Sequence, residues 1–267
     1  MDDHEFEPIA ASLREAMIEY YRVSGERLGA AAWHNTLETN SGYVERRAGP
    51  LLELYMQHSG RRSLRGVRVA DLGCGFGALS LFFAAHGATV DGIDPNASRL
   101  AVGREVAARH RLPVTLRPAR MQDLDDLEDA VYDLAIQNNS FCYIVGWDDR
   151  AQALRETHRV LRGGGLLISR NPNRLAPIDQ FTGIPALNWL PPDAADRAAG
   201  LLGRHRSRVR MLTDRAARQE LRRAGFDDVR TVVPFGSRWP RGLHRVAGYQ
   251  HLVARRPAHG GPVPAAG

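Results

Sequence analysis

Residues 69–77, Val-Ala-Asp-Leu-Gly-Cys-Gly-Phe-Gly, carry three alternate glycines directly after an apolar run. The run Val67–Leu72 is rich in β-branched and apolar residues, which favours a β-strand. The glycines permit backbone conformations that other residues avoid, and they let a ligand approach the main chain closely. A helix that starts near Gly77 would point its free amide groups at that ligand. This stretch therefore predicts a strand, a ligand-binding turn and a helix in succession.

The glycine spacing and one acidic residue indicate which ligand the turn binds. The spacing is G-x-G-x-G, whereas a dinucleotide-binding turn has G-x-G-x-x-G. Asp71 lies inside the end of the strand, where it would repel a pyrophosphate. A cationic ligand would be attracted to that carboxylate. S-adenosylmethionine carries a sulfonium and an ammonium group, so the pattern favours this cofactor over a dinucleotide.

Further polar residues follow the next two predicted strands. Asp94 ends the second strand, and its carboxylate could accept hydrogen bonds from two neighbouring ribose hydroxyls. Asp91 lies earlier in that strand, and we expect it to face solvent. After the third strand, the run Met121–Asp123 offers an amide, an acid and an apolar side chain for an adenine ring.

Strand and helix patterns alternate along the chain, which predicts parallel βαβ units with helices on both faces of the sheet. The strands expected in this part span residues 67–72, 88–93, 113–116, 131–137 and 166–169. The helices expected between them span residues 79–86, 97–110 and 148–161, the second capped by Asn96 or Ser98. Two helices precede them, at 8–32 and 43–59, and Pro50 could break or kink the second. After the proline-rich residues 171–211 we expect a helix at 214–224 and an antiparallel pair of strands at 229–233 and 247–254.

The chain resembles the class I (Rossmann-like) S-adenosylmethionine-dependent methyltransferases. The resemblance is carried by VADLGCGFGALS, VDGIDPNASRL, ARMQDL, YDLAIQNNSFCYI and ALRETHRVLRGGGLLIS, within residues 67–170. It implies an α/β fold with a seven-stranded, mostly parallel sheet and an antiparallel last strand. It also implies that the helices at residues 1–62 cover the active site of a methyltransferase domain at 63–256. The proline-rich break at about 171–211 predicts a substrate cap after strand five, and the Pro/Gly/Ala-rich composition of residues 257–267 predicts a disordered tail.

The same resemblance assigns cofactor contacts to individual residues. Gly73, Gly75 and Gly77 would lie against the methionine portion, with Asp71 beside them, and Asp94 with Pro95 would lie at the ribose. Met121 and either Gln122 or Asp123 would lie at the adenine. Asn138 and Asn139, at the end of the fourth strand, would border the methyl group. Arg46 or Arg47 could pair with the cofactor carboxylate.

The sequence identifies residues that contact the substrate less definitely than residues that contact the cofactor. Asn139 could hold a polar group of the substrate, and Tyr143 could line the methyl channel. His34 could act as a base, because its ordinary pKa suits neutral pH. An aromatic and polar mixture in the cap, which includes Trp189 and Arg174, indicates a partly polar and anionic small molecule.

Composition limits the remaining function classes. The formal net charge of the 267 residues is +6, and all of the Lys+Arg total is arginine, as a GC-rich genome would produce. The basic charge is therefore weak evidence for nucleic acid, and we expect no nucleic-acid partner. The acidic start, the lack of a long apolar run and the two cysteines predict a cytoplasmic protein with reduced thiols and no membrane span. No zinc-binding spacing is present, and the sequence says nothing of the oligomeric state.

The function predicted from these patterns is O- or N-methylation of a small molecule, such as a natural product or a sugar-containing compound. Two alternatives stay open. One is methylation of RNA, which the arginine-rich segments at 203–210 and 238–245 would support. The other is a protein that binds or uses S-adenosylmethionine without methylating, for example a cyclase.

Overall fold

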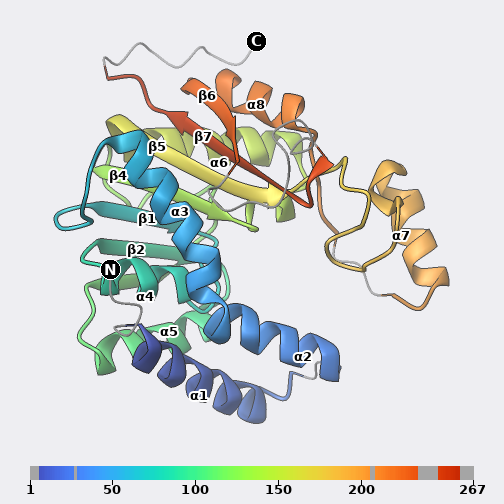
Figure 1. Ribbon diagram of the computed structural model, residues 1–267, viewed down its shortest axis with the longest axis horizontal. Coiled ribbons are helices and arrows are strands. Elements are labelled where there is room, and N and C mark those ends of the chain that lie inside the picture. The colour runs from blue at the N-terminus through green and yellow to red at the C-terminus, as the bar shows by residue number, and fades with distance from the viewer. Residues whose placement is uncertain (1–5, 27–28, 205–207, 234–245, 259–267) are drawn as a thin grey trace. The chain divides into compact units, whose positions relative to one another are not determined.

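The computed structural model describes residues 6–26, 29–204, 208–233 and 246–258. Its seven strands form one mixed sheet in the order β3-β2-β1-β4-β5-β7-β6 (Figure 1). The strands are β1 (Arg68–Leu72), β2 (Thr89–Asp94), β3 (Val114–Pro118), β4 (Tyr132–Asn138), β5 (Leu161–Pro172), β6 (Asp227–Val232) and β7 (Tyr249–Arg255). The sheet is mostly parallel, and β7 runs antiparallel to both β5 and β6. The predicted fold class and the antiparallel last strand are therefore confirmed.

The chain divides into two compact units, which are described separately. The first unit comprises residues 1–124 and 132–135, and the second comprises residues 125–131 and 136–267. In the first unit, β2 pairs in parallel with both β1 and β3. Its helices are α1 (Glu7–Ser24), α2 (Ala30–Leu37), α3 (Val44–Ser59), α4 (Ala78–Ala85) and α5 (Ala97–Arg109), with a π-helical turn at Glu38–Gly42.

Two details of the N-terminal helices differ from the sequence-based expectation. The single helix expected at 8–32 is wrong, because α1 ends at Ser24 and Gly25 follows it with a left-handed φ of 70°. Glycine adopts this conformation without the steric cost that other residues meet, so it commonly ends a helix. Pro50 does not interrupt α3, which runs from Val44 to Ser59.

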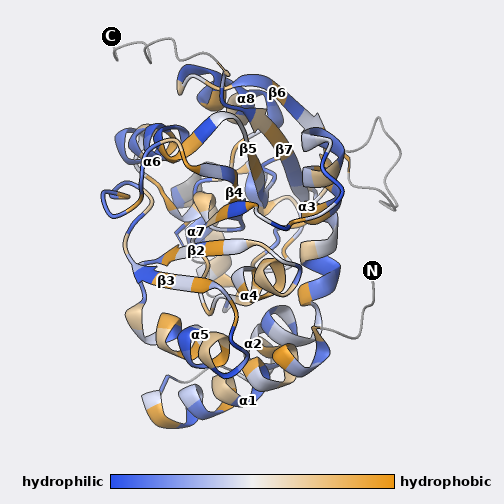
Figure 2. Ribbon diagram, turned by 90° about the vertical axis from the view of Figure 1, so that its left-hand side faces the viewer, coloured by the Kyte–Doolittle hydropathy of each residue, from blue (hydrophilic) through white to orange (hydrophobic). Residues whose placement is uncertain are grey.

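The core of the first unit forms around α4, which follows the glycine-rich turn. Every residue of α4 from Ala78 to Ala84 is buried, and the helix is mostly apolar in colour in Figure 2. It packs against α3 and β2, while α5 packs against β3 and α1. Phe6, just before α1, meets Phe82 edge-on at a ring distance of 5.4 Å. An apolar helix buried on all sides fixes the position of the turn that precedes it.

Helix α5 approaches the same turn closely at Gly103. A Cβ atom at this position would lie 2.5 Å from the carbonyl oxygen of Phe76 and 2.6 Å from a methyl carbon of Leu116. Real Cβ atoms do not come so close to backbone atoms, so only glycine permits this packing distance. The helix thereby supports the turn from behind.

The second unit contains α6 (Trp147–Val160), α7 (Pro192–Leu201) and α8 (Asp214–Arg223), with short 3-10 helices at Phe141–Tyr143 and Leu187–Trp189. Helix α6 packs against β5, and α8 packs against β6 and β7. Strand β5 begins at Leu161, five residues earlier than expected, and includes the three glycines. The amide of Gly164 donates to the carbonyl of Arg256, and the amide of Arg256 donates to Gly165, so residues far along the chain make this segment a strand.

The segment after β5 has its own small core. Leu187, Ala195 and Ala199 are buried together, with Ile184 packed against them. Backbone bridges pair Asn173 with Leu212 and Ile178 with Pro185. This segment corresponds to the expected cap at 171–211, although Asn171 and Pro172 belong to β5. The expected tail lies almost wholly outside the described residues.

We predict that Gly103→Ala destabilises the protein in spite of the better helix propensity of alanine. Overpacking against the Phe76 carbonyl should lower the free energy of unfolding by about 1–3 kcal/mol. Gly200→Ala in α7 is the matched control, because a Cβ there meets no atom within 4 Å. The control should leave the free energy unchanged or raise it by up to about 1 kcal/mol. Urea unfolding measures both changes, and equal effects of the two substitutions would contradict this packing.

Candidate functional site

The glycine-rich turn is fixed to the end of β2 by backbone hydrogen bonds. The amides of Gly73 and Cys74 both donate to the carbonyl oxygen of Ile93, at 2.7 and 3.0 Å. Gly73, Gly75 and Gly77 have φ angles of 82°, 59° and 80°, a region that glycine enters freely. The turn therefore has the conformation that its glycine spacing predicts, and it is attached to the neighbouring strand.

Asp94 connects the turn to the start of α5. Its Oδ2 accepts from the amide of Gly75 at 3.0 Å, and its Oδ1 accepts from the amide of Asn96 at 2.9 Å. Asn96 in turn caps α5 by accepting from the amide of Arg99 at 3.0 Å, as the sequence predicts. Asp94 is half-buried and Pro95 beside it is exposed. Each carboxylate oxygen keeps a second lone pair with which it can accept from a ligand hydroxyl.

Asp71 is buried at the end of β1. The Ser80 hydroxyl, in the first turns of α4, donates to its Oδ2 at 2.7 Å. Burial raises the pKa of Asp71 to about 6, helped by the charge of Asp94 and opposed by the Ser80 hydrogen bond and the Arg47 charge. A carboxyl group in this environment gains from a nearby cation, because a positive charge stabilises its ionised form.

The expectation that Asp91 faces solvent is wrong. Asp91 is 7% exposed, and the hydroxyl of Tyr132 donates to its Oδ2 at 2.8 Å. The guanidinium of Arg117, on the adjacent strand β3, forms an ion pair with its Oδ1. Arg117 lies on the adjacent strand β3 and Tyr132 on β4, which β1 separates from β2, so the pattern within β2 alone could not reveal these partners. Asp91 is occupied by these structural contacts.

Among the N-terminal residues, Arg47 approaches the turn more closely than the expected Arg46. The charge of Arg47 acts on Asp71, and its guanidinium donates to the carbonyl of Thr39 at 2.5 Å. Arg46 is exposed, with its guanidinium 5.4 Å from the centre of the Tyr43 ring. His34 is exposed on α2. Of the two arginines, the helix therefore turns Arg47 toward the acids of the site.

Aromatic contacts join α1 to the glycine-rich turn. Phe76 is buried within the turn, and its ring lies 5.5 Å from that of Tyr20 and 6.0 Å from that of Tyr21. Tyr21 also meets the ring of Trp33 on α2 edge-on at 4.9 Å. The sequence patterns did not identify this cluster, since its members are far apart in the chain.

The residues expected at the adenine follow β3 in the first unit. Met121 is buried, Gln122 is half-buried and Asp123 is exposed. The amide of Asp123 donates to the carbonyl of Arg120 at 3.0 Å, so the segment forms a tight turn. Met121 offers apolar contact, and Gln122 is the less exposed of the two polar candidates.

In the second unit, Asn138 and Asn139 end β4 with unsatisfied polar atoms. Asn138 Oδ1 accepts from Arg170 at 3.3 Å, but Asn138 Nδ2 and Asn139 Oδ1 are buried and have no hydrogen-bond partner among the described residues. Asn139 has a left-handed φ of 57°, and its amide donates to the carbonyl of Arg170 at 2.6 Å. Buried polar atoms without partners are rare in folded proteins, so these two indicate a place for a ligand or water.

Tyr143 follows in the short helix after β4. Its side chain is 48% exposed, and its ring meets that of Phe181 at 6.0 Å in an edge-on arrangement. Phe141 in the same helix is buried beneath the guanidinium of Arg150, which lies 4.0 Å from the ring centre. Tyr143 is thus available to a ligand, while Phe141 serves packing.

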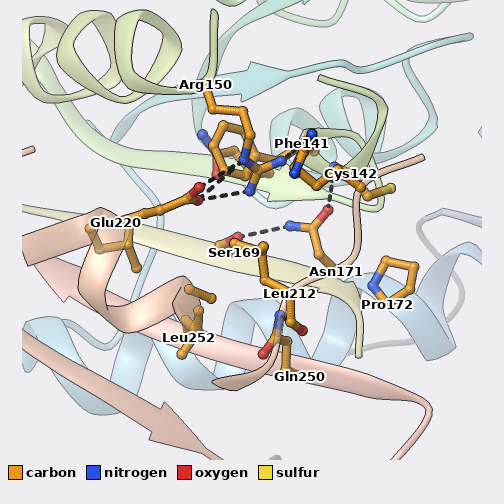
Figure 3. Close-up of a pocket in the computed structure, with 14 residues that line it drawn as sticks. Phe141, Cys142, Arg150, Ser169, Asn171, Pro172, Leu212, Glu220, Gln250 and Leu252 are labelled. Atoms are coloured by element: carbon orange, nitrogen blue, oxygen red, sulfur yellow. Dashed lines mark hydrogen bonds and ion pairs between the residues drawn. The ribbon is translucent and has the colours of Figure 1, made fainter. Parts of the chain in front are cut away.

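A small cavity with polar and apolar lining residues lies behind this helix (Figure 3). Arg150 donates to Glu220 at 2.8 Å and to the carbonyls of Phe141 and Ile144 at 3.0 Å each. Asn171 Oδ1 accepts from the amide of Cys142 at 3.2 Å. The cavity holds about 20 Å³ of free space, room for about one water molecule. It therefore positions the segment after β4 and is too small for an organic substrate.

The remaining expectations concern metal binding, membrane spans, the two cysteines and the arginine-rich segments. Among the described residues, no group of three His, Cys, Asp or Glu side chains could hold a metal ion. None of the helices in the described ranges has the length and apolarity needed to cross a membrane. Both cysteines are free, Cys142 buried and Cys74 half-buried. The arginine-rich segment 238–245 lies outside the described residues, as do residues 205–207 of the other one.

The described residues fit the cofactor that the sequence resemblance implies. A Cβ atom at Gly75 would meet no other atom within 4 Å, so the turn is open at this glycine. The two acids beside it, Asp71 and Asp94, suit a ligand with positive charge and hydroxyl groups. The unsatisfied atoms of Asn138 and Asn139 lie at the end of the strand that the resemblance assigns to the methyl group.

Two solved structures share this fold. One is the PH0226 protein from Pyrococcus horikoshii OT3, with 20% identity, a TM-score of 0.59 and coverage of 90% of this chain and 98% of that chain. The other is the 1,6-didemethyltoxoflavin-N1-methyltransferase of Burkholderia thailandensis, solved with 1,6-didemethyltoxoflavin and S-adenosylhomocysteine. It has 20% identity and a TM-score of 0.55, and the match covers 96% of this chain and 91% of that chain.

Sequence comparison gives relatives and a family. The Ubiquinone biosynthesis O-methyltransferase of Nitrobacter winogradskyi is 31% identical over 183 residues, which cover 66% of this chain and 64% of that protein. A protein of the same name from Caulobacter sp. (strain K31) is 29% identical over 141 residues, 52% of this chain and 55% of that protein. The chain thus spans about half to two thirds of the length of the curated relatives it matches. Residues 70–169 match the family described as methyltransferase domain. Residues 70–169 therefore contain a methyltransferase domain, and the strand order of the sheet is that of the Rossmann-like methyltransferase fold. S-adenosyl-L-methionine is the cofactor that this domain implies.

Proposed function

We propose that the protein transfers a methyl group from S-adenosylmethionine to an oxygen or nitrogen atom of a small molecule. The observation that carries this proposal is the open glycine-rich turn, whose Gly75 amide is bound to Asp94 and whose neighbour Asp71 is a buried acid. The relatives named Ubiquinone biosynthesis O-methyltransferase favour a small molecule and an oxygen acceptor.

The cofactor, when bound, supplies a methyl group that its sulfonium centre has already activated. The three glycines let the main chain approach its methionine portion, and Asp94 accepts from the ribose hydroxyls. Met121 packs against the adenine, and Gln122 or Asp123 recognises its edge. Asn138 contributes its free amide group at the end of β4.

The charges of the first unit suit the two charged ends of the methionine portion. Asp71 attracts the cationic groups, which explains why a buried carboxyl is kept where burial raises its pKa. Arg47, which already acts on Asp71, is placed to pair with the cofactor carboxylate, and the exposed Arg46 is the weaker candidate. These roles extend the family resemblance to residues of this chain.

The acceptor is held by residues of the second unit. Asn139 Oδ1 can accept a hydrogen bond from the acceptor group, and the exposed face of Tyr143 can contact it. The expected substrate cap at about 171–211 and the expected cover of the active site by the N-terminal helices are part of this proposal. Methyl transfer needs mainly the correct placement of the two reactants. A base is needed only for an acceptor that is protonated, and His34 is the candidate from α2.

We predict that Asp94→Asn weakens binding of S-adenosylmethionine at least about tenfold, since it removes acceptors that contribute about 1.5–3 kcal/mol when charged. Isothermal titration calorimetry measures the affinity, and the melting temperature shows whether the variant is folded. Asp126→Asn, at an exposed position, is the matched control and should bind as the wild type does. Failure of the wild type to bind, or equal affinity in Asp94→Asn, would rule out the cofactor assignment.

We predict that Asp71→Asn removes a pH dependence from stability. In the unfolded chain Asp71 ionises near its ordinary pKa of 3.8, whereas in the folded protein it keeps its proton up to about pH 6. The folded state therefore binds more protons between these values, and its stability falls as the pH rises through this window. Relative to Asp71→Asn, the wild type should lose on the order of 2–3 kcal/mol between pH 4 and 7.

Urea unfolding of both proteins at several pH values measures this difference, and the variant should also bind S-adenosylmethionine more weakly at pH 7. Subtracting the two profiles cancels the titration of all other carboxyl groups. If the free energy of unfolding depended on pH in the same way in both proteins, burial would not raise the pKa of Asp71, and the assignment would be contradicted.

A further inference from the structure

We propose that Arg170 recognises an anionic group, a carboxylate in the simplest case, on the small-molecule acceptor. The proposal rests on the methyltransferase function above and names the substrate class of the same site. It assigns to Arg170 a role in specificity that lies outside the cofactor contacts.

Arg170 occupies the carboxyl-end half of β5, beside the residues that end β4. Its carbonyl accepts from the amide of Asn139 at 2.6 Å, and its guanidinium donates to Asn138 Oδ1 at 3.3 Å. In the antiparallel pair with β7, Arg170 lies opposite His251. The guanidinium also lies 3.7 Å from the centre of the Tyr249 ring on β7. Three strands of the second unit therefore place this cation next to the unsatisfied amide of Asn138.

The charge of Arg170 has no acidic partner among the described residues. Its recorded contacts are with Asn138 and Tyr249. The buried Arg150 of the same unit does have such a partner, since it pairs with Glu220 at 2.8 Å. The half-buried Arg256 has no acidic partner among the described residues either, but its guanidinium donates to the carbonyls of Arg159 and Leu161. A cation withdrawn from water without a counter-charge destabilises the folded protein. Such a residue has a physical reason to be present if a ligand supplies the negative charge.

The surroundings of Arg170 are consistent with a retained positive charge that needs an anion. Burial lowers the pKa of Arg170, and burial together with the Arg170 charge lowers the pKa of His251 to about 3. His251 is therefore neutral at physiological pH and neither neutralises nor adds to the charge. Tyr249 stabilises the cation through its ring face, but it brings no formal negative charge.

The free donors at this place match the geometry of a carboxylate. A guanidinium has five N–H donors in a planar fork, which can bind both oxygens of one carboxylate. Asn139, whose backbone amide donates to the Arg170 carbonyl, has a side-chain oxygen that is an acceptor without a partner among the described residues. Donors for an anion and an acceptor for a hydroxyl or amine hydrogen thus belong to two residues that a backbone hydrogen bond joins. The substrate class that satisfies both is a small molecule with an anionic group and a hydroxyl or amino group.

Benzoate is a suitable probe, and benzamide is its neutral match of similar size. Each is titrated by calorimetry into protein saturated with S-adenosylhomocysteine, using the wild type, Arg170→Met and Arg155→Met. Arg155, exposed on α6 and bonded to Gln152, is the control for loss of one positive charge. We expect the wild type and Arg155→Met to bind benzoate with millimolar affinity. Arg170→Met should bind benzoate at least tenfold more weakly. It should also show no preference for benzoate over benzamide. Affinity for S-adenosylhomocysteine should stay within about twofold in all three.

Three results would overturn the proposal. The first is that the wild type does not bind benzoate at concentrations up to about 50 mM, and the second is that Arg170→Met binds benzoate as tightly as the wild type. The third is a selective loss of S-adenosylhomocysteine binding in Arg170→Met, which would place Arg170 at the cofactor carboxylate. If Arg170→Met does not fold, Arg170→Lys keeps the charge but loses the fork, and its benzoate affinity should lie below that of the wild type. Failure of the wild type to bind S-adenosylhomocysteine would instead refute the proposed function, and benzoate titrated into the protein alone would still test the anion site.

Discussion

The carbonyl of Ile93 and the carboxylate of Asp94 hold the glycine-rich turn, and the rest of the first unit is arranged around that attachment. Three consecutive amides, those of Gly73, Cys74 and Gly75, find their acceptors at the end of β2. Because their hydrogen bonds are satisfied there, the turn can present an open surface at Gly75 without leaving its own backbone unpaired. Helix α4 then begins at a defined place, and its Ser80 reaches Asp71. Gly103 lets α5 approach the same turn from the other side.

Each of the two units contains a charge that burial destabilises. In the first unit Asp71 is a carboxyl whose pKa burial raises, and in the second unit Arg170 is a cation with no acid among its described contacts. The buried charge of Arg150 is compensated by Glu220, and stability alone favours such compensation. A cationic cofactor suits Asp71 and an anionic acceptor suits Arg170, so both residues agree with the proposed chemistry.

The elements and the cofactor turn were predictable from the sequence because they depend on local signals. Apolar runs, glycine spacing and the Asn96 cap locate strands, turn and helix within a few residues. The errors arose where distant residues decide the outcome. The partners of the buried Asp91 lie on two other strands, β3 and β4. Strand β5 begins early because residues after β7 pair with its glycines. Arg170 lies within the range 67–170 that carries the sequence resemblance. Its lack of an acidic partner among the described residues becomes visible only when β4, β5 and β7 are aligned.

The same distinction explains why the cofactor could be inferred more fully than the acceptor. In the proposed function, the cofactor is bound by backbone amides and strand-end acids, which a short motif specifies, whereas the acceptor is bound by side chains from several strands. In the proposed function, Asn139 bears on the reaction type. Its left-handed backbone is tolerated by asparagine better than by most residues, and its amide donates to the Arg170 carbonyl, which fixes its backbone beside β5. If the proposed acceptor hydroxyl or amine donates to Asn139 Oδ1, a carbon acceptor would leave that oxygen unpaired at a cost of about 1–3 kcal/mol. The proposal therefore favours methylation of oxygen or nitrogen over carbon.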